Sequence, residues 1–202
     1  MILADIGEVG VHKEGGETVV LRPSFYAVSK LGSPSEIVQL FYRVMSAQTE
    51  IEVLEDCVAV IWACTDLDVS DLTGFWAHEE RAVFWSPGMM SAPEIIIMAR
   101  HLLVHGVTGE IKQRRRKKEK PEFMAEFNAA EFASVAMAHL NLSEKEAWNM
   151  TMTGFVAAMT AKYPPSEKER ELESMLDNYD ETMERARKMR AARIAKEALK
   201  NG

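Results

Sequence analysis

The apolar and polar positions along the chain predict a short β-hairpin followed mainly by helices. Residues 6–12 and 18–21 are β-prone stretches separated by Lys13-Glu14-Gly15-Gly16. Glycine supplies the positive φ that tight hairpin turns need, so the two stretches are expected to pair. Arg22-Pro23 ends the second strand, because proline has no N–H to donate to a neighbouring strand.

Apolar residues three and four positions apart predict helices through most of the remaining chain. A hydroxyl residue followed by proline and an early acid marks two helix starts, at Ser33-Pro34-Ser35-Glu36 and at Ser91-Ala92-Pro93-Glu94. Ser143-Glu144-Lys145-Glu146 matches a capping box. The expected helices cover residues 25–31, 33–44, 51–65, 91–105, 123–139, 143–150, 151–163 and a last stretch from 166.

Three stretches in the middle of the chain carry further expectations. The helix over residues 51–65 is nearly apolar on all sides, which is typical of a buried central element. Residues 66–75 are interpreted as a polar turn region and residues 81–85 as a short strand. His78-Glu79-Glu80 is interpreted as a solvated loop rather than as an acid–base group.

These elements predict an α+β fold that is mainly α-helical, with an N-terminal β-hairpin, a helical body and a long charged C-terminal helix. Residues 1–111 are expected to form the hairpin and the first helices, and residues 112–121 a basic linker or loop. Residues 122–165 form a helical segment that packs with the N-terminal part. Residues 166–202 form the extended charged helix.

The 202 residues carry a net charge of −7, but the charges are segregated along the chain. Residues 1–111 hold 16 acidic and 6 basic side chains, whereas residues 112–120 hold seven bases and one acid. Residues 166–184 are acidic and residues 185–202 are basic. The folded body is therefore acidic, which argues against a general nucleic-acid-binding protein.

Composition excludes further classes of protein. Two cysteines cannot staple a secreted disulfide fold, we expect no signal peptide, and no apolar run reaches the roughly 18 residues of a membrane span. Methionine is frequent, with 13 residues, of which eight follow residue 120. Methionine is over-used on surfaces that accept more than one packing, and a loosely chosen helical core is the alternative explanation.

No residue pattern predicts catalysis or a cofactor, so we expect a protein that is not an enzyme. His101 and His105 have the i, i+4 spacing of a shared metal site, but no third ligand follows at a recognisable spacing. Surface or capping histidines near a helix end are the favoured interpretation. Cys57 and Cys64 lie two helical turns apart, too far for a disulfide, and are interpreted as core residues.

The long terminal helix carries one apolar stripe on a highly charged surface. Its acidic first half and basic second half complement the helix dipole and also suit antiparallel pairing with a second copy. Docking on its own domain is the alternative. The stripe is predicted to contact a partner through Leu172, Met175, Leu176, Tyr179 and Met183.

Three features in the second half of the chain form a recognisable pattern. They are Leu142-Ser143-x-x-Glu146-Ala147-Trp148-x-Met150-Thr151, the aromatic residues Phe127, Phe132 and Phe155, and Lys162-Tyr163-Pro164. In this pattern the segment resembles the tail assembly chaperones of long-tailed bacteriophages.

Two other segments are similar to an uncharacterised phage family encoded beside tail tube genes. One joins Arg22-Pro23-Ser24-Phe25 to Leu31-Gly32-Ser33-Pro34-x-Glu36-Ile37-Val38, and the other is Ala99-Arg100-x-Leu102-x-x-His105-Gly106. The resemblance covers most of residues 5–165 and leaves the terminal helix outside.

The resemblance implies a chaperone that binds the tape-measure protein in the host cell cytoplasm and is absent from the mature virion. It implies contact with the tail tube protein as well, and a homo-oligomer is compatible with it. No membrane is involved. Within the resembling segment, Trp148, Met150 and Phe155 are the expected partner-binding residues.

The basic segments keep one alternative open, a nucleic-acid-binding phage accessory protein that acts through residues 112–120 and 185–200. The first segment lacks aromatic residues for base stacking, so a solvated loop or a loop facing an acidic protein partner is favoured. Its candidate contact residues are Arg114, Arg115, Arg116, Lys117 and Lys118.

Truncation after Pro165 tests the expected role of the terminal helix in self-association or partner contact. Removal of the apolar stripe is expected to change the particle mass measured by light scattering, or to release a bound partner. An unchanged mass together with unchanged partner binding would refute that role.

Overall fold

We describe the fold from a computed structural model of the chain, which places residues 2–13, 15–47, 53–79, 82–109, 125–164 and 166. The chain divides into two compact units. The first joins Met1–Ile111 to Glu122–Lys162, and the second joins Lys112–Pro121 to Tyr163–Gly202. The basic run and the apolar stripe of the predicted terminal helix lie outside the described residues. The architecture below is that of the first unit.

The predicted N-terminal hairpin is confirmed. Strands β1 (Val9–His12) and β2 (Thr18–Leu21) pair antiparallel, with Val9 opposite Leu21 and His12 opposite Thr18. The first strand begins later than expected, because Ala4–Ile6 form a 3-10 turn. Gly7 ends this turn at a φ of 89°, a left-handed conformation that favours glycine.

Serine caps set the starts of the early helices. Ser24 Oγ accepts from Ala27 N at 3.1 Å at the start of α1 (Phe25–Ser29). Capping boxes begin α2 (Pro34–Ser46) with Ser33 and Glu36, and α5 (Ala92–Leu103) with Ser91 and Glu94. The serine hydroxyl and backbone N–H groups donate to these glutamates and lower their pKa.

The helices after residue 125 follow the predicted order. They are α6 (Ala129–Leu140), α7 (Glu144–Trp148) and α8 (Met152–Lys162). The expected capping box of Ser143 and Glu146 begins α7, and Thr151 Oγ1 accepts from Gly154 N at 3.0 Å at the start of α8. The fold is therefore α+β and mainly helical, as predicted.

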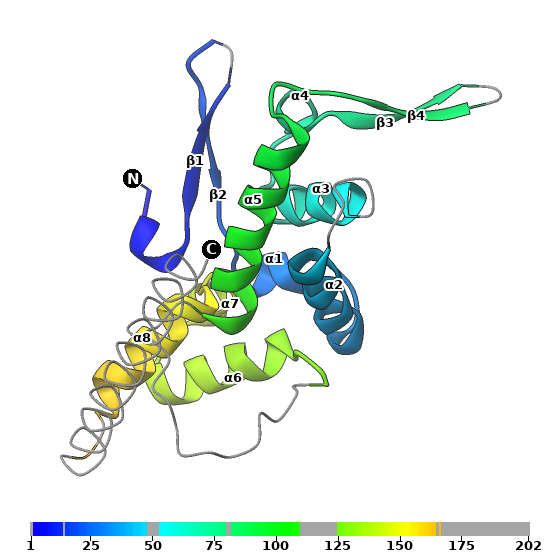
Figure 1. The fold of residues 1–202 in the computed structure, drawn as a ribbon. Coiled ribbons are helices and arrows are strands. Elements are labelled where there is room, and N and C mark those ends of the chain that lie inside the picture. Colours follow the sequence, from blue (N-terminus) through cyan, green and yellow to red (C-terminus); the bar gives the residue numbers. More distant parts are fainter. Residues whose placement is uncertain are drawn as a thin grey trace, which may run out of the picture. The chain divides into compact units, whose positions relative to one another are not determined.

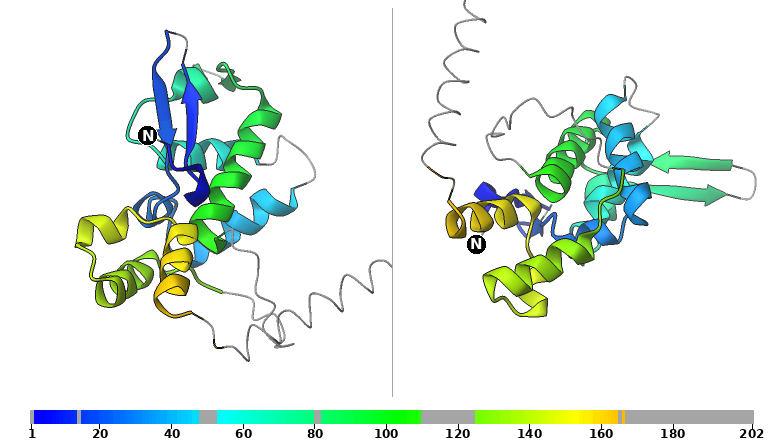
Figure 2. Two further views of the ribbon diagram at one scale, coloured as in Figure 1. Left: turned by 90° about the vertical axis from the view of Figure 1, so that its left-hand side faces the viewer. Right: turned by 90° about the horizontal axis from the view of Figure 1, so that it is seen from below.

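A second hairpin lies where the sequence suggested a polar turn region and a solvated loop. Strand β3 (Phe75–Glu79) pairs antiparallel with β4 (Ala82–Ser86), in a register that places position 76 opposite position 85. This hairpin extends away from the helices (Figures 1 and 2). The prediction of a strand over residues 81–85 was right, but its partner was missed. A short helix, α4 (Ser70–Thr73), also interrupts the expected turn region.

The core forms around α3 (Leu54–Ala63) and α5, which pack along each other. Figure 1 shows α5 running through the middle of the helical body. Buried α3 residues include Cys57, Val60 and Ile61, which confirms most of the expected central position. Ala59 and Trp62 are the exceptions, because both are exposed.

A long side chain joins α5 to the end of α2. The guanidinium of Arg100 donates to the carbonyls of Val44 at 3.0 Å and Ala47 at 3.3 Å. These carbonyls belong to the last turn of α2, where no intrahelical donor remains. After α5 the chain continues as a π-helical turn, Val104–Thr108, so the helical path runs past the expected end at residue 105 and ends at Gly109.

Gly7→Ala is expected to destabilise the first unit by about 2–4 kcal/mol. A Cβ at this position would lie 2.2 Å from His105 Cβ, in addition to the strain of its positive φ. Gly16→Ala is the matched control, since Gly16 has a φ of 88° but open space around it. The control should cost about 1 kcal/mol, the backbone strain alone. Urea unfolding followed by circular dichroism measures both, and equal losses would contradict the clash.

Candidate binding surface

Two of the three segments that carry the phage resemblance meet in the structure. Phe25 N donates to Met150 O at 2.8 Å, and Ser24 forms an isolated antiparallel bridge with Thr151. Arg22 N donates to Cys64 O, also at 2.8 Å. Residues 22–25 thus join the first hairpin, the end of α3 and the start of α8.

Four phenylalanines pack together beside this junction and define the phenylalanine cluster: Phe25, Phe127, Phe132 and Phe155. The ring centroids of Phe25 lie 5.8 Å from those of both Phe132 and Phe155, and Phe127 stacks on Phe132 at 5.2 Å. Such stacked and edge-to-face pairs add about 0.5–1.5 kcal/mol beyond the area that they bury. Every member belongs to the resembling motifs, so these motifs build the core.

This packing corrects one predicted partner contact. Phe155 is buried and lies edge-on to Phe25 and Phe132, so it is not available to a partner in this conformation. Trp148 and Met150 are partly buried and pack against the same core. Their predicted role in partner binding stays a prediction.

A buried ion pair holds the N-terminal turn against the junction. Glu8 is buried, and Arg22 Nε lies 2.6 Å from its Oε1. Leu3 N donates to the other oxygen, Oε2, at 2.7 Å. Oε2 therefore accepts a hydrogen bond, whereas Oε1 is compensated by the charge of Arg22 and accepts no hydrogen bond from the described residues. The Arg22 side chain is partly exposed, and it lines a cavity.

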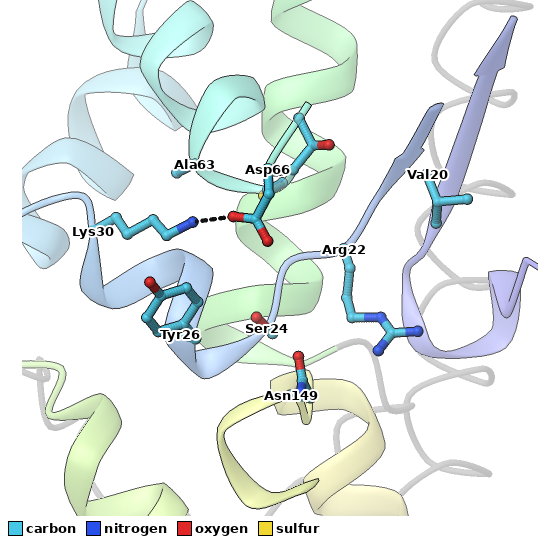
Figure 3. A pocket seen from close by; sticks show the side chains of 10 residues that line it. Val20, Arg22, Ser24, Tyr26, Lys30, Ala63, Asp66 and Asn149 are labelled. Carbon is cyan, nitrogen blue, oxygen red and sulfur yellow. Dashed lines mark hydrogen bonds and ion pairs between the residues drawn. The ribbon is translucent and has the colours of Figure 1, made fainter. Parts of the chain in front are cut away.

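This polar cavity has a volume of about 220 Å³. Figure 3 shows its lining, with Lys30 reaching Asp66 across the upper part and Tyr26 beneath the lysine. Lys30 Nζ lies 2.9 Å from Asp66 Oδ1 and 4.5 Å from the centre of the Tyr26 ring. Cation and carboxylate thus neutralise each other, and Ser24 and Asn149 add uncharged polar groups.

A second, more open hollow of about 650 Å³ lies beside the polar cavity, and Thr65 and Asp66 line both. We call it the apolar hollow. Its large side chains are Trp62, Leu67 and Phe75, which are 42%, 51% and 49% exposed. Trp62 Nε1 donates to the buried Thr73 Oγ1 at 2.9 Å, which fixes the orientation of the indole. The remaining lining residues are Asp68 and Ser70.

Sequence reasoning missed the apolar hollow. Trp62 was assigned to the core, and Leu67 and Phe75 fell in a segment interpreted as a polar turn. The segment has four apolar residues, of which Val69 and Leu72 are buried, and the sequence alone does not show that Leu67 and Phe75 stay exposed. Exposed apolar residues that gather in this way mark interaction sites more often than scattered ones do.

The two histidines of the candidate metal pair are close, but neither geometry nor surroundings favour a metal. Their ring centroids lie 4.4 Å apart, and His105 is buried with Nδ1 2.8 Å from Thr153 Oγ1. No group of three or more metal-binding side chains occurs among the residues that the structure describes. The surface interpretation of His105 was wrong, because it packs in the core.

The cysteine prediction is confirmed, since Cys57 and Cys64 are buried and not joined by a disulfide. Burial raises the pKa of both thiols to about 12, so neither is a reactive thiolate at neutral pH. No helix within the described ranges is long and apolar enough to cross a membrane.

Arg22→Ala is expected to lower the free energy of unfolding by about 2–4 kcal/mol, because it leaves the Glu8 carboxylate buried without its cation. Arg43→Ala is the matched control. Arg43 also pairs with a carboxylate, that of Asp56 at 2.8 Å, but its side chain is more exposed and its loss should cost under about 1 kcal/mol. Chemical unfolding compares the variants. Adding Glu8→Gln to Arg22→Ala should restore part of the loss, and a larger loss would contradict the buried-charge explanation.

A family model matches most of the chain, over residues 21–56 and 46–181. The matched part begins at the last residue of β2 and includes the junction at residues 22–25, the phenylalanine cluster and the apolar hollow. No curated protein and no solved structure matches the chain. The chain belongs to the family of unknown function DUF6246.

Proposed function

We propose that this protein is a tail assembly chaperone that binds the tape-measure protein of a long-tailed bacteriophage and assists assembly of the tail tube. It acts in the host cell cytoplasm and leaves before the virion is complete. The sequence motifs described above support this proposal. The single structural observation that supports it best is the apolar hollow of Trp62, Leu67 and Phe75.

The size of the apolar hollow suits reversible binding. Each of its three large side chains is about half exposed, so covering the rest contributes about 1 kcal/mol per residue. A few such contacts give weak to moderate affinity once the entropy of association is subtracted. A chaperone needs an affinity in this range, because it must hold an apolar helix in solution and then release it into the tube.

The apolar hollow is also held rigidly. Trp62 lies near the end of α3, which packs on α5 through a buried face, and its indole donates a hydrogen bond to Thr73. The carbonyl of Cys64, two residues later, accepts from the junction at Arg22. A surface that is preformed loses less entropy on binding than a mobile one.

Co-expression with the tape-measure protein encoded beside it tests the proposal. The tape-measure protein should be soluble only with its partner, and the two should elute together in gel filtration. Leu67→Asp should weaken the complex at least tenfold, because it places a charge in the apolar contact.

Ile97→Asp is the matched control for Leu67→Asp. Ile97 is 68% exposed on α5 and lines neither the polar cavity nor the apolar hollow, so its variant should bind as the wild type does. Equal solubility of the tape-measure protein alone, with no complex in gel filtration, would refute the proposed function.

A further inference from the structure

We infer that the apolar hollow binds an amphipathic helix that carries lysine or arginine beside its apolar residues. This inference deepens the proposed function, because it names the chemistry of the partner segment that the same surface takes. It rests on the charges around Trp62, Leu67 and Phe75 and on how these charges are already paired.

Acidic groups surround the apolar hollow. Asp66 and Asp68 line it, and Asp71 follows Ser70 in α4. The Asp66 side chain is 88% exposed. Hydrogen bonds donated by Ser70, first from its backbone N–H, lower the pKa of Asp68, and the charge of Lys13 lowers it further. The C-terminal end of α3, the negative end of its dipole, lies beside them.

Two nearby lysines form salt bridges with two of these carboxylates. Lys13 Nζ lies 3.0 Å from Asp71 Oδ1, and Lys30 Nζ lies 2.9 Å from Asp66 Oδ1. Lys13 also donates to the backbone carbonyl of Asp68, but no salt bridge reaches the Asp68 side chain within the described residues. Asp68 is thus a rim carboxylate that makes no salt bridge within the described residues, although the charge of Lys13 acts on it and lowers its pKa.

The aromatic residues suit a cationic partner for a second reason. Trp62 and Phe75 present partly exposed rings, and a lysine or arginine above an aromatic face is attracted by its quadrupole. The acidic excess of residues 1–111 would further steer a basic segment toward this unit.

The source of the lining favours a helix over an added strand. Trp62 comes from α3, Leu67 from the following loop and Phe75 from the first residue of β3. Three anchors from separate elements form a side-chain groove rather than a strand edge. Helices dock in such grooves through apolar residues three and four positions apart.

The full chain can be tested by fluorescence anisotropy with two labelled synthetic peptides of equal length. One is an amphipathic helix of leucine and lysine, and the other has glutamate in place of lysine. The lysine peptide should bind at least tenfold more tightly, and its affinity should fall as salt is added.

Asp68→Asn should weaken the lysine peptide about threefold or more. An asparagine side chain still accepts the hydrogen bond that Ser70 N donates to Asp68 Oδ1 at 2.9 Å, so the start of α4 is kept. Asp5→Asn is the matched control, because it removes the same charge from an exposed site that lines neither cavity. Leu67→Ser, which removes the apolar side chain without adding an acid, should weaken peptide binding at least tenfold.

Equal affinity for the two peptides, or equal effects of Asp68→Asn and Asp5→Asn, would overturn the inference. A particle mass in light scattering that falls in Leu67→Asp without any peptide would overturn it in favour of a second copy as the occupant. A tape-measure complex that persists at high salt and in Asp68→Asn, with no peptide binding, would overturn the inference and leave the proposed function standing. Peptide binding without a tape-measure complex would support the inference and refute the proposed function.

Discussion

The rest of the first unit depends on the position of Phe25. Its ring meets Phe132 and Phe155, while its backbone N–H donates to Met150 O. One residue thus joins α1 to α6, to α8 and to the turn between α7 and α8, which are far apart in sequence. Ser24 adds to this connection, since its side chain caps α1 and its backbone forms a β-bridge with Thr151. Proline before them restricts the backbone, so this short segment holds its direction with little entropy left to lose.

The same junction connects the core to both cavities. Arg22 compensates the buried Glu8 with its side chain and anchors Cys64 O with its backbone N–H. The end of α3 is thereby fixed, and the loop that carries Asp66 and Leu67 starts from a defined point. The polar cavity and the apolar hollow share residues of this loop, so a change at the junction would alter the lining of both. Stability and the candidate surface are therefore coupled through a few residues of the junction.

Much of this fold could be predicted because its signals are local. Ser33 with Glu36, Ser91 with Glu94 and Ser143 with Glu146 begin helices where their capping boxes stand, since each box closes within four residues. The hairpin β3–β4 was missed because no glycine or asparagine marks its turn, and alternation over five residues is a weak signal. Trp62 was misassigned because the apolar pattern of a helix does not show which of its apolar faces is covered by another element. Phe155 was misassigned for the converse reason, as its partners Phe25 and Phe132 lie far away in sequence.

The motif residues build the core, whereas the residues of the candidate surface are exposed. The two sets therefore support different conclusions, one about the fold and one about binding. Phe25, Arg100 and His105 are motif residues, and each one packs in the core or ties two helices together. A resemblance that such residues carry speaks first for a shared fold. Trp62, Leu67 and Phe75 lie outside those motifs. Their side chains are exposed, so packing of the fold does not explain why these residues are apolar. Exposed apolar area costs solubility without stabilising the chain, so three such residues that line one acid-rimmed hollow argue for binding. The fold follows from the motifs, and the proposed partner chemistry follows from the exposed residues beside them.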